Sequence, residues 1–166
     1  MWTTGRAFAH ASAAVSIICS ASCLTVLLMR YVCDAPDGAT WFRFETEAEA
    51  EAEAALMRHA VDKYYRRHEG AARESYRAPK TAASFEQAIG LKDHIAKTMP
   101  LFLTLRSSDG LATAMLPPGG RNQVNFRIVI VGPENADPYE AHEPAIQALA
   151  QHFNIELPRE TCFPYA

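Results

Sequence analysis

One uncharged apolar stretch near the N-terminus most constrains what this chain can fold into. It runs from Ala11 to Met29, and Arg30 follows it. As a helix, about 19 residues measure roughly 28 Å, which is close to the ~30 Å hydrocarbon core of a bilayer. The stretch therefore predicts a membrane helix over residues 11–32, after a leader of residues 1–10. A cleaved signal peptide and a buried core helix are the alternatives.

Small polar residues are distributed along this stretch, among them Ser16 and Ser20. Such residues let helices approach closely, and their hydroxyls bond to a neighbouring backbone. We therefore expect Ser16 and Ser20 to contact other membrane helices. Tyr31 and Trp41 follow at the headgroup level, where amphipathic rings are favoured, with core packing as the alternative for Trp41.

The remaining length and the charge limit the classes of partner. Residues 33–166 suffice for one compact soluble domain. The formal net charge is −3, so the sequence predicts no nucleic-acid partner, which would favour a basic surface. Cys33 and Cys162 are the cysteines outside the apolar stretch. One disulfide between them and two free thiols both remain open.

A long helix is predicted from Thr46 to Gly70. Thr46 and Glu49 have the spacing of a capping box, and Gly70 is typical of a helix end. Glutamates crowd the first turns and bases gather from Lys63 to His68, an order that complements the helix dipole. Because alternate positions turn around a helix, the glutamates form no single stripe, and we expect them on a solvated face, with an acidic docking surface as the alternative.

The second half of this helix mixes aromatic and basic side chains. Its apolar residues recur at helical spacing and predict a face that packs on the core, with an aromatic binding surface as the alternative. This face comprises Met57, Val61, Tyr64 and Tyr65. A patch of basic and aromatic residues can also serve nucleic-acid binding, but one short patch in an acidic chain is weak support for that function. The residues assigned to partner binding are Tyr64, Tyr65, Arg66 and Arg67.

The rest of the chain predicts an α+β fold. A loop or linker over residues 71–83 precedes a short helix, which Ser84 caps and Gly90 ends or kinks, with a continuation of the helix over residues 91–98 as the alternative. Alternating apolar residues then predict an antiparallel meander of three strands. These strands and the final helix are placed at residues 101–106, 111–116, 124–131 and 144–152.

No catalytic or metal-binding signature is present. The loops at Gly119 and Gly132 could approach an anion, but neither continues into a phosphate-binding spacing. None of the six histidines has the spacing of a zinc protease, and no serine lies in a nucleophile elbow. The acidic run from Glu134 to Glu143 lacks the pattern of a calcium loop and is interpreted as solvated turn residues. The sequence therefore predicts no enzyme activity, cofactor, metal or small-molecule substrate.

The order of elements resembles a known architecture. A membrane helix, a long helix, a short helix ending in Ile89-Gly90 and a meander resemble the membrane-anchored domains of mitochondrial inner-membrane translocase subunits and cytochrome oxidase assembly factors. Residues Asp109 to Gly120 (DGLATAMLPPGG) are similar to the strand and proline-glycine turn of those domains. The resemblance implies a non-catalytic binding module in the intermembrane space.

We therefore expect a non-catalytic, single-pass accessory or assembly subunit of a respiratory or translocase complex. Its partners are other membrane-protein subunits and the lipid bilayer. The mitochondrial inner membrane is the favoured location, with a secretory-pathway or bacterial inner membrane as alternatives. The competing hypothesis is a membrane-tethered enzyme or ligand-binding domain that uses the loops at Gly119 and Gly132.

Overall fold

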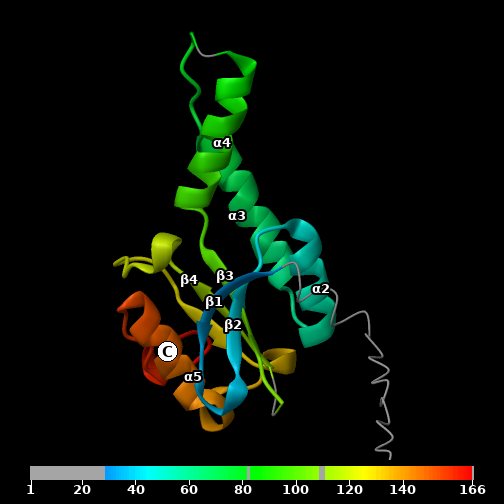
Figure 1. Ribbon diagram of the computed structural model, residues 1–166, viewed down its shortest axis with the longest axis vertical. Coiled ribbons are helices and arrows are strands. Elements are labelled where there is room, and N and C mark those ends of the chain that lie inside the picture. Colours follow the sequence, from blue (N-terminus) through cyan, green and yellow to red (C-terminus); the bar gives the residue numbers. More distant parts are fainter. Residues whose placement is uncertain (1–28, 82, 109–110, 166) are drawn as a thin grey trace, which may run out of the picture.

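The computed structural model describes residues 29–81, 83–108 and 111–165. Within these residues the predicted α+β class is confirmed, with an antiparallel meander and a C-terminal helix (Figure 1). The sheet has the strand order β1-β2-β3-β4-β5, so each strand pairs with its neighbour in the chain. The elements are β1 (Arg30–Asp34), β2 (Thr40–Arg43), α2 (Glu47–Met57), α3 (Val61–Ser75), α4 (Ser84–Thr98), β3 (Leu101–Arg106), β4 (Leu111–Leu116), β5 (Val129–Val131) and α5 (Tyr139–Phe153).

The central strand β3 divides the core into two layers. Leu101, Leu103 and Leu105 belong to the apolar cluster that includes α5. Phe102, between them, belongs to a second cluster that includes α2 and α3. Successive side chains of a strand point to opposite faces, which explains the division. Helices therefore cover the sheet on both faces.

α5 packs on the first face through Ile146 and Leu149, both buried. The indole Nε1 of Trp41 donates a hydrogen bond to the carbonyl oxygen of Ala145 at 2.8 Å, so β2 is joined directly to α5. Trp41 is completely buried, and it belongs to the core rather than to a membrane surface. A buried indole needs such a partner for its N–H.

Aromatic rings fill the second face. The ring of Phe102 lies 5.7 Å from that of Phe44 and 5.2 Å from that of Tyr65, measured between centroids. The Tyr65 hydroxyl donates to the carbonyl oxygen of Glu45 at 2.5 Å. Burial raises the pKa of Tyr65 to about 12, so the hydroxyl keeps its proton at neutral pH.

The glutamate repeat of α2 separates into two faces. Glu49 and Glu53 are buried: the Glu49 carboxylate caps the start of α2, and that of Glu53 bonds to the sheet. Glu47 and Glu51 instead accept hydrogen bonds from Arg66 of α3, at 3.2 and 3.0 Å. Residues four apart share one side of a helix. Glu49 and Glu53 therefore lie on one side of α2, and Glu47 and Glu51 lie on the side that meets α3. The prediction of a purely solvated acidic face is therefore wrong.

Glu53 carries the most deeply buried charge among the described residues, with no exposed surface. Its Oε2 pairs with Nη2 of Arg106 on β3 at 2.5 Å, and its Oε1 accepts from the Thr113 hydroxyl on β4 at 2.7 Å. Arg106 also donates to the Thr104 hydroxyl. A buried carboxylate is tolerated only with such partners. This network fixes α2 across two strands.

The capping box of α2 is confirmed, whereas the single long helix is not. The Thr46 hydroxyl accepts from the backbone N–H of Glu49 at 3.2 Å, and the Glu49 carboxylate accepts from that of Thr46 at 3.0 Å. α2 ends because Arg58 adopts a left-handed conformation with φ of 53°. α3 then continues past Gly70, so the loop predicted over residues 71–83 is shorter.

The start of the folded region differs from the prediction. Residues 30–32 belong to β1, so the end of the predicted membrane helix is a strand. Two strands, β1 and β2, were not predicted. In the part of the chain that the structure describes, no helix is long and apolar enough to cross a bilayer. Residues 11–28 of the predicted span lie outside that part.

The strands at residues 101–106 and 111–116 are confirmed, but the third predicted strand is reduced to β5. α5 begins before Pro144, which lies within it and follows a residue with non-helical backbone, His142. After α5, Phe163 forms a parallel bridge with Val129 of β5. Cys33 and Cys162 are free thiols, so the alternative disulfide is not formed in this structure.

We predict that Arg106→Met lowers the free energy of unfolding by about 3–5 kcal/mol, because it leaves Glu53 charged and buried without its cation. Urea unfolding of the full chain, followed by far-UV circular dichroism, measures this. Arg159→Met is the matched control, since its pair with Asp137 is exposed and should contribute far less. Equal losses in the two variants would contradict the argument from burial.

Two adjacent glycines allow a second test. Gly119 and Gly120 share a φ of +66°, but a Cβ would meet nothing at Gly119 and would overlap the ring of Phe153 at Gly120. Gly119→Ala should therefore lower the free energy of unfolding by about 1–2 kcal/mol through backbone strain alone. Gly120→Ala should lose about 1–3 kcal/mol more through overpacking. Thermal unfolding compares them; a Gly119→Ala variant as unstable as Gly120→Ala would contradict this.

Candidate functional site

α3, α4 and the segment between them form a helical hairpin that projects beyond the sheet, and we call residues 61–98 the arm (Figure 1). α4 contains no buried residue. It meets α3 through a hydrogen bond, because the Ser75 hydroxyl lies 2.8 Å from Nε2 of His94. The two segments also approach closely at Gly90, where a Cβ would overlap the Tyr76 hydroxyl. Gly90 therefore permits the close approach, and the helix continues through it to Thr98, which was the alternative to an end at Gly90.

The start of α4 also differs from the prediction. Ala83 is the N-cap, and its backbone N–H donates to the Glu86 carboxylate at 3.1 Å. Alanine has no side-chain acceptor, so only this half of a capping box exists. Ser84 is the first helical residue rather than the cap.

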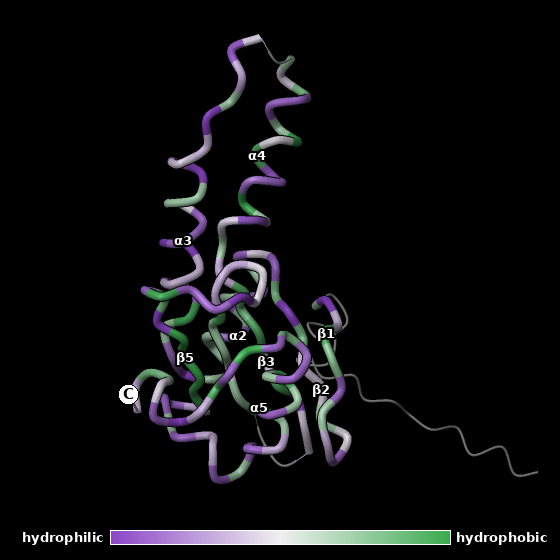
Figure 2. Tube along the Cα trace, turned by 90° about the vertical axis from the view of Figure 1, so that its left-hand side faces the viewer, coloured by the Kyte–Doolittle hydropathy of each residue, from purple (hydrophilic) through white to green (hydrophobic). Residues whose placement is uncertain are grey.

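The far end of α4 exposes large apolar side chains. Phe85 is 73% exposed and Ile89 is 47% exposed. They lie four residues apart, so they share one side of the helix. In Figure 2, α4 carries hydrophobic segments well beyond the sheet. An ordered hairpin that leaves such residues in water has a surface suited to a protein partner.

The predicted partner-binding residues separate in the structure. Tyr64 is 51% exposed and Arg67 is exposed, and both remain available on the arm. Tyr65 lies in the core, and its ring does not reach the surface. Arg66 is engaged by Glu47, Glu51 and Asp62, and thus fastens α3 to α2. Ser16 and Ser20 lie outside the described residues.

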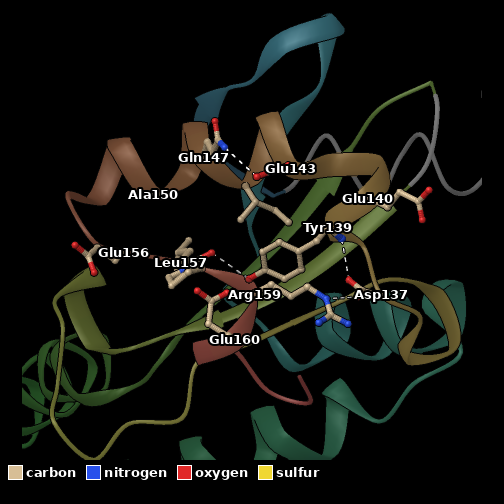
Figure 3. Close-up of a pocket in the computed structure, with 12 residues that line it drawn as sticks. Asp137, Tyr139, Glu140, Glu143, Gln147, Ala150, Glu156, Leu157, Arg159 and Glu160 are labelled. Atoms are coloured by element: carbon tan, nitrogen blue, oxygen red, sulfur yellow. Dashed lines mark hydrogen bonds and ion pairs between the residues drawn. The ribbon is translucent and has the colours of Figure 1, made fainter. Parts of the chain in front are cut away.

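A second surface feature lies between α5 and the C-terminal segment (Figure 3). It is a hollow of about 810 Å³, which we call the acidic groove. Buried apolar side chains, Ile146 and Leu157, form part of its floor. The Tyr139 hydroxyl donates to the carbonyl oxygen of Leu157 at 3.2 Å, which holds the segment beside the helix. Its charged lining residues are Asp137, Glu140, Glu143, Glu156, Arg159 and Glu160.

The groove has a strong excess of negative charge. Arg159 pairs with Asp137 at 2.6 Å and stacks on the ring of Tyr165. The backbone N–H of Tyr139, together with Arg159, holds the pKa of Asp137 below its usual value. Among the described residues, none of the four glutamates of the groove has an Arg or Lys partner within ion-pair distance. This surface suits a cationic segment with an apolar part.

The glycine loops of the competing hypothesis have structural roles. The N–H of Gly132 donates to the carbonyl oxygen of Ala136 at 2.7 Å, and that of Gly120 donates to Pro117 at 2.9 Å. These two amides are therefore occupied within the chain. A shallow hollow of about 360 Å³ lies beside Asn122 and Asn154, with Glu156 as its charged lining residue. Its chemistry does not favour an anion.

Thr113, His59 and Glu53 lie together beneath α2 and superficially resemble a catalytic triad. Thr113 donates its single hydroxyl proton to Glu53, so Nε2 of His59, 3.0 Å away, must be the donor in the second bond. Activation of a nucleophile needs the reverse arrangement, with histidine accepting the hydroxyl proton. Thr113 is also buried. The geometry therefore suits packing rather than nucleophilic catalysis.

Burial lowers the pKa of His59, and Nδ1 of this ring has no hydrogen-bond partner. A neutral ring with the proton on Nε2 is consistent with both observations. Within the described residues, no group of three or more His, Cys, Asp or Glu side chains could hold a metal ion. His59 is therefore best described as a neutral member of the buried network.

Sequence reasoning missed both surfaces, although weak signals exist. Phe85 and Ile89 are an apolar pair at helical spacing in a helix with few other large apolar residues. Glu140 and Glu143 lie on α5 beside Gln147, but the two glutamates were predicted to be solvated turn residues. The C-terminal glutamates join them through tertiary contacts, among them the hydrogen bond at Leu157 and the pair between Arg159 and Asp137.

The chain matches no family model, no curated protein and no solved structure. The fold and the two surfaces therefore rest on the geometry of this chain alone.

The lowered pKa of His59 predicts a dependence of stability on pH. Below about pH 6.5 the unfolded chain binds a proton that the folded chain resists, so the free energy of unfolding falls as the pH decreases. His59→Asn should flatten this fall, by up to about 1.4 kcal/mol per pH unit. Burial also lowers the pKa of His68, so adding His68→Asn should flatten it further. Urea unfolding between pH 7.5 and 5.5 measures the slopes; an unchanged slope in both variants would contradict the prediction.

Proposed function

We propose that this chain is a non-catalytic, single-pass accessory subunit of a membrane protein complex, and that its arm binds a neighbouring subunit. The observation that carries the proposal is the exposure of Phe85 and Ile89 at the far end of a well-formed helical hairpin. Burying two such side chains against a partner would stabilise the contact by about 1.5–3 kcal/mol each.

The base of the arm is joined to the rest of the domain by several contacts. Arg66 fastens α3 to α2, and α2 is fastened to the sheet through Glu53. The aromatic cluster around Phe102 packs under the base of α3. A surface on a fixed element loses less entropy on binding than one on a mobile loop, which favours a specific contact.

The membrane anchor in this proposal lies within residues 11–28, in the apolar stretch that ends at Met29. Met29 is buried against the second face of the sheet, and β1 starts at the next residue. An anchor that leads directly into the sheet would keep the folded domain close to the bilayer, within reach of other membrane subunits. The mitochondrial inner membrane remains the proposed location, on the strength of the resemblance carried by Asp109 to Gly120.

The non-catalytic part of this proposal is supported by the position of the buried polar side chains. Glu53, Arg106 and Thr113 bond to one another inside the domain. These groups are therefore used inside the domain and do not converge on a surface hollow, as catalytic groups would. The arm and the acidic groove instead combine charge with apolar surface, as protein-binding surfaces do.

We predict that the wild-type protein resists carbonate extraction from membranes and co-migrates with a large complex on native gels after mild detergent extraction. Phe85→Ser combined with Ile89→Ser should keep the anchor and the fold but lose most of the co-migration, since truncating a central apolar anchor weakens binding by about 2 kcal/mol, roughly thirtyfold.

Val124→Ser is the matched control, because Val124 is a fully exposed apolar residue outside the arm. This variant should stay with the complex. Migration of the wild type as a free monomer would refute the proposal, as would co-migration of the arm variant at the wild-type level.

A further inference from the structure

Unpaired positive charge is concentrated on the arm. Residues 61–98 contain eight Lys and Arg against five Asp and Glu, although the whole chain is acidic. Across the described residues, most Lys and Arg side chains with no carboxylate within ion-pair distance belong to the arm: Lys63, Arg67, Arg77, Lys80, Lys92 and Lys97. The arm therefore has charge available for an acidic partner.

Two of these cations lie at the far end of the hairpin, close in sequence to its exposed apolar pair. Nη1 of Arg77 donates to the backbone carbonyls of Glu74 and Tyr76, at 2.6 and 2.9 Å, so its bonds leave its charge unneutralised. Lys80 is exposed. We call Arg77, Lys80, Phe85 and Ile89 the arm tip. It combines cations with large apolar side chains.

The acidic groove has the complementary combination. Its rim carries four glutamates that have no cationic partner within the part of the chain that the structure describes, and its floor is apolar at Ile146 and Leu157. A ligand that satisfies both parts must be cationic and also present an apolar side chain. Figure 3 shows that the glutamates come from α5 and from the C-terminal segment, so the rim borders the hollow on two sides.

The arm tip cannot reach the groove of its own chain. In both views the arm projects from one end of the molecule, while α5 and the C-terminus lie toward the other (Figures 1 and 2). The arm is also fastened to α2 by Arg66. A contact between the two surfaces must therefore join two molecules.

We infer that the acidic groove is a docking site for the arm tip of a second copy of this chain. The inference rests on the proposed function, because it identifies the subunit that covers the arm. The contact joins different surfaces of the two copies, so it is a head-to-tail contact that builds a ring or an open row of subunits. Phe85 or Ile89 enters the apolar floor, and Arg77 and Lys80 meet the glutamates of the rim.

An anionic membrane surface is the main alternative occupant of a basic, apolar tip. It would account for Arg77, Lys80 and Phe85, but it would leave the acidic groove without a partner. A second copy accounts for both surfaces with charges present on one chain. Complementary patches of this kind fix the register of a contact and exclude wrong partners.

The test uses the full chain in nanodiscs of neutral lipid at low salt, with its mass measured by light scattering and native mass spectrometry. The tip variant carries Arg77→Glu and Lys80→Glu, and the groove variant carries Glu140→Lys and Glu143→Lys. Each variant alone should associate more than about tenfold more weakly than the wild type, because like charges then face each other. A 1:1 mixture of the two should restore association, since each reversed surface meets its complement.

Lys92→Glu with Lys97→Glu is the matched control, because it reverses two unpaired cations of α4 away from the tip. This variant should associate like the wild type. Wild-type association in the tip or groove variant, or no recovery in the mixture, would overturn the inference. So would tip-dependent binding to anionic vesicles combined with unchanged self-association, which would assign the tip to lipid.

The two proposals fail separately. Loss of the large complex in the Phe85→Ser, Ile89→Ser variant, together with a wild type that does not self-associate, would keep the proposed function and reject the second copy as the partner. Retention of the complex in that variant would reject the proposed function, whatever the result of the charge reversals.

Discussion

The buried pair between Glu53 and Arg106 is the interaction on which the arrangement of the domain depends. It joins α2 to β3, and the bond from Thr113 to Glu53 extends the connection to β4. α3 then takes its position from α2, because Arg66 binds the glutamates on the other side of that helix. The direction of the arm therefore depends on the buried carboxylate of Glu53. This carboxylate lies near the base of the hairpin, whereas the exposed apolar pair lies at the far end.

Local signals in the sequence predict a large part of this fold. Strands β3 and β4 and the cap at Thr46 depend on neighbouring residues, and the structure has them where the pattern placed them. Features that depend on distant partners were missed. β2 is a strand because it pairs with β3, some sixty residues on, and Glu53 is buried because Arg106 lies opposite. Nothing in the local sequence distinguishes the buried glutamates of this repeat from the solvated ones.

The candidate surfaces were harder to predict than the fold, for a related reason. Phe85 and Ile89 form an ordinary amphipathic pair in sequence, and only the absence of a facing element among the described residues makes them a surface. The acidic groove needs two segments, and the hydrogen bond between Tyr139 and Leu157 brings them together. Tyr65 and Arg66 show the opposite case, because their chemistry suits a partner but is used within the chain.

The bridge between Phe163 and Val129 also determines how this sheet can meet other proteins. The C-terminal segment occupies the outer side of β5, so one edge of the sheet is closed to an added strand. The other edge, β1, has a bulge between Tyr31 and Cys33 and charged residues at both ends, devices that discourage edge-to-edge pairing. Both edges of the sheet therefore resist pairing with a strand of another molecule, and the helices are the surfaces that remain available for assembly.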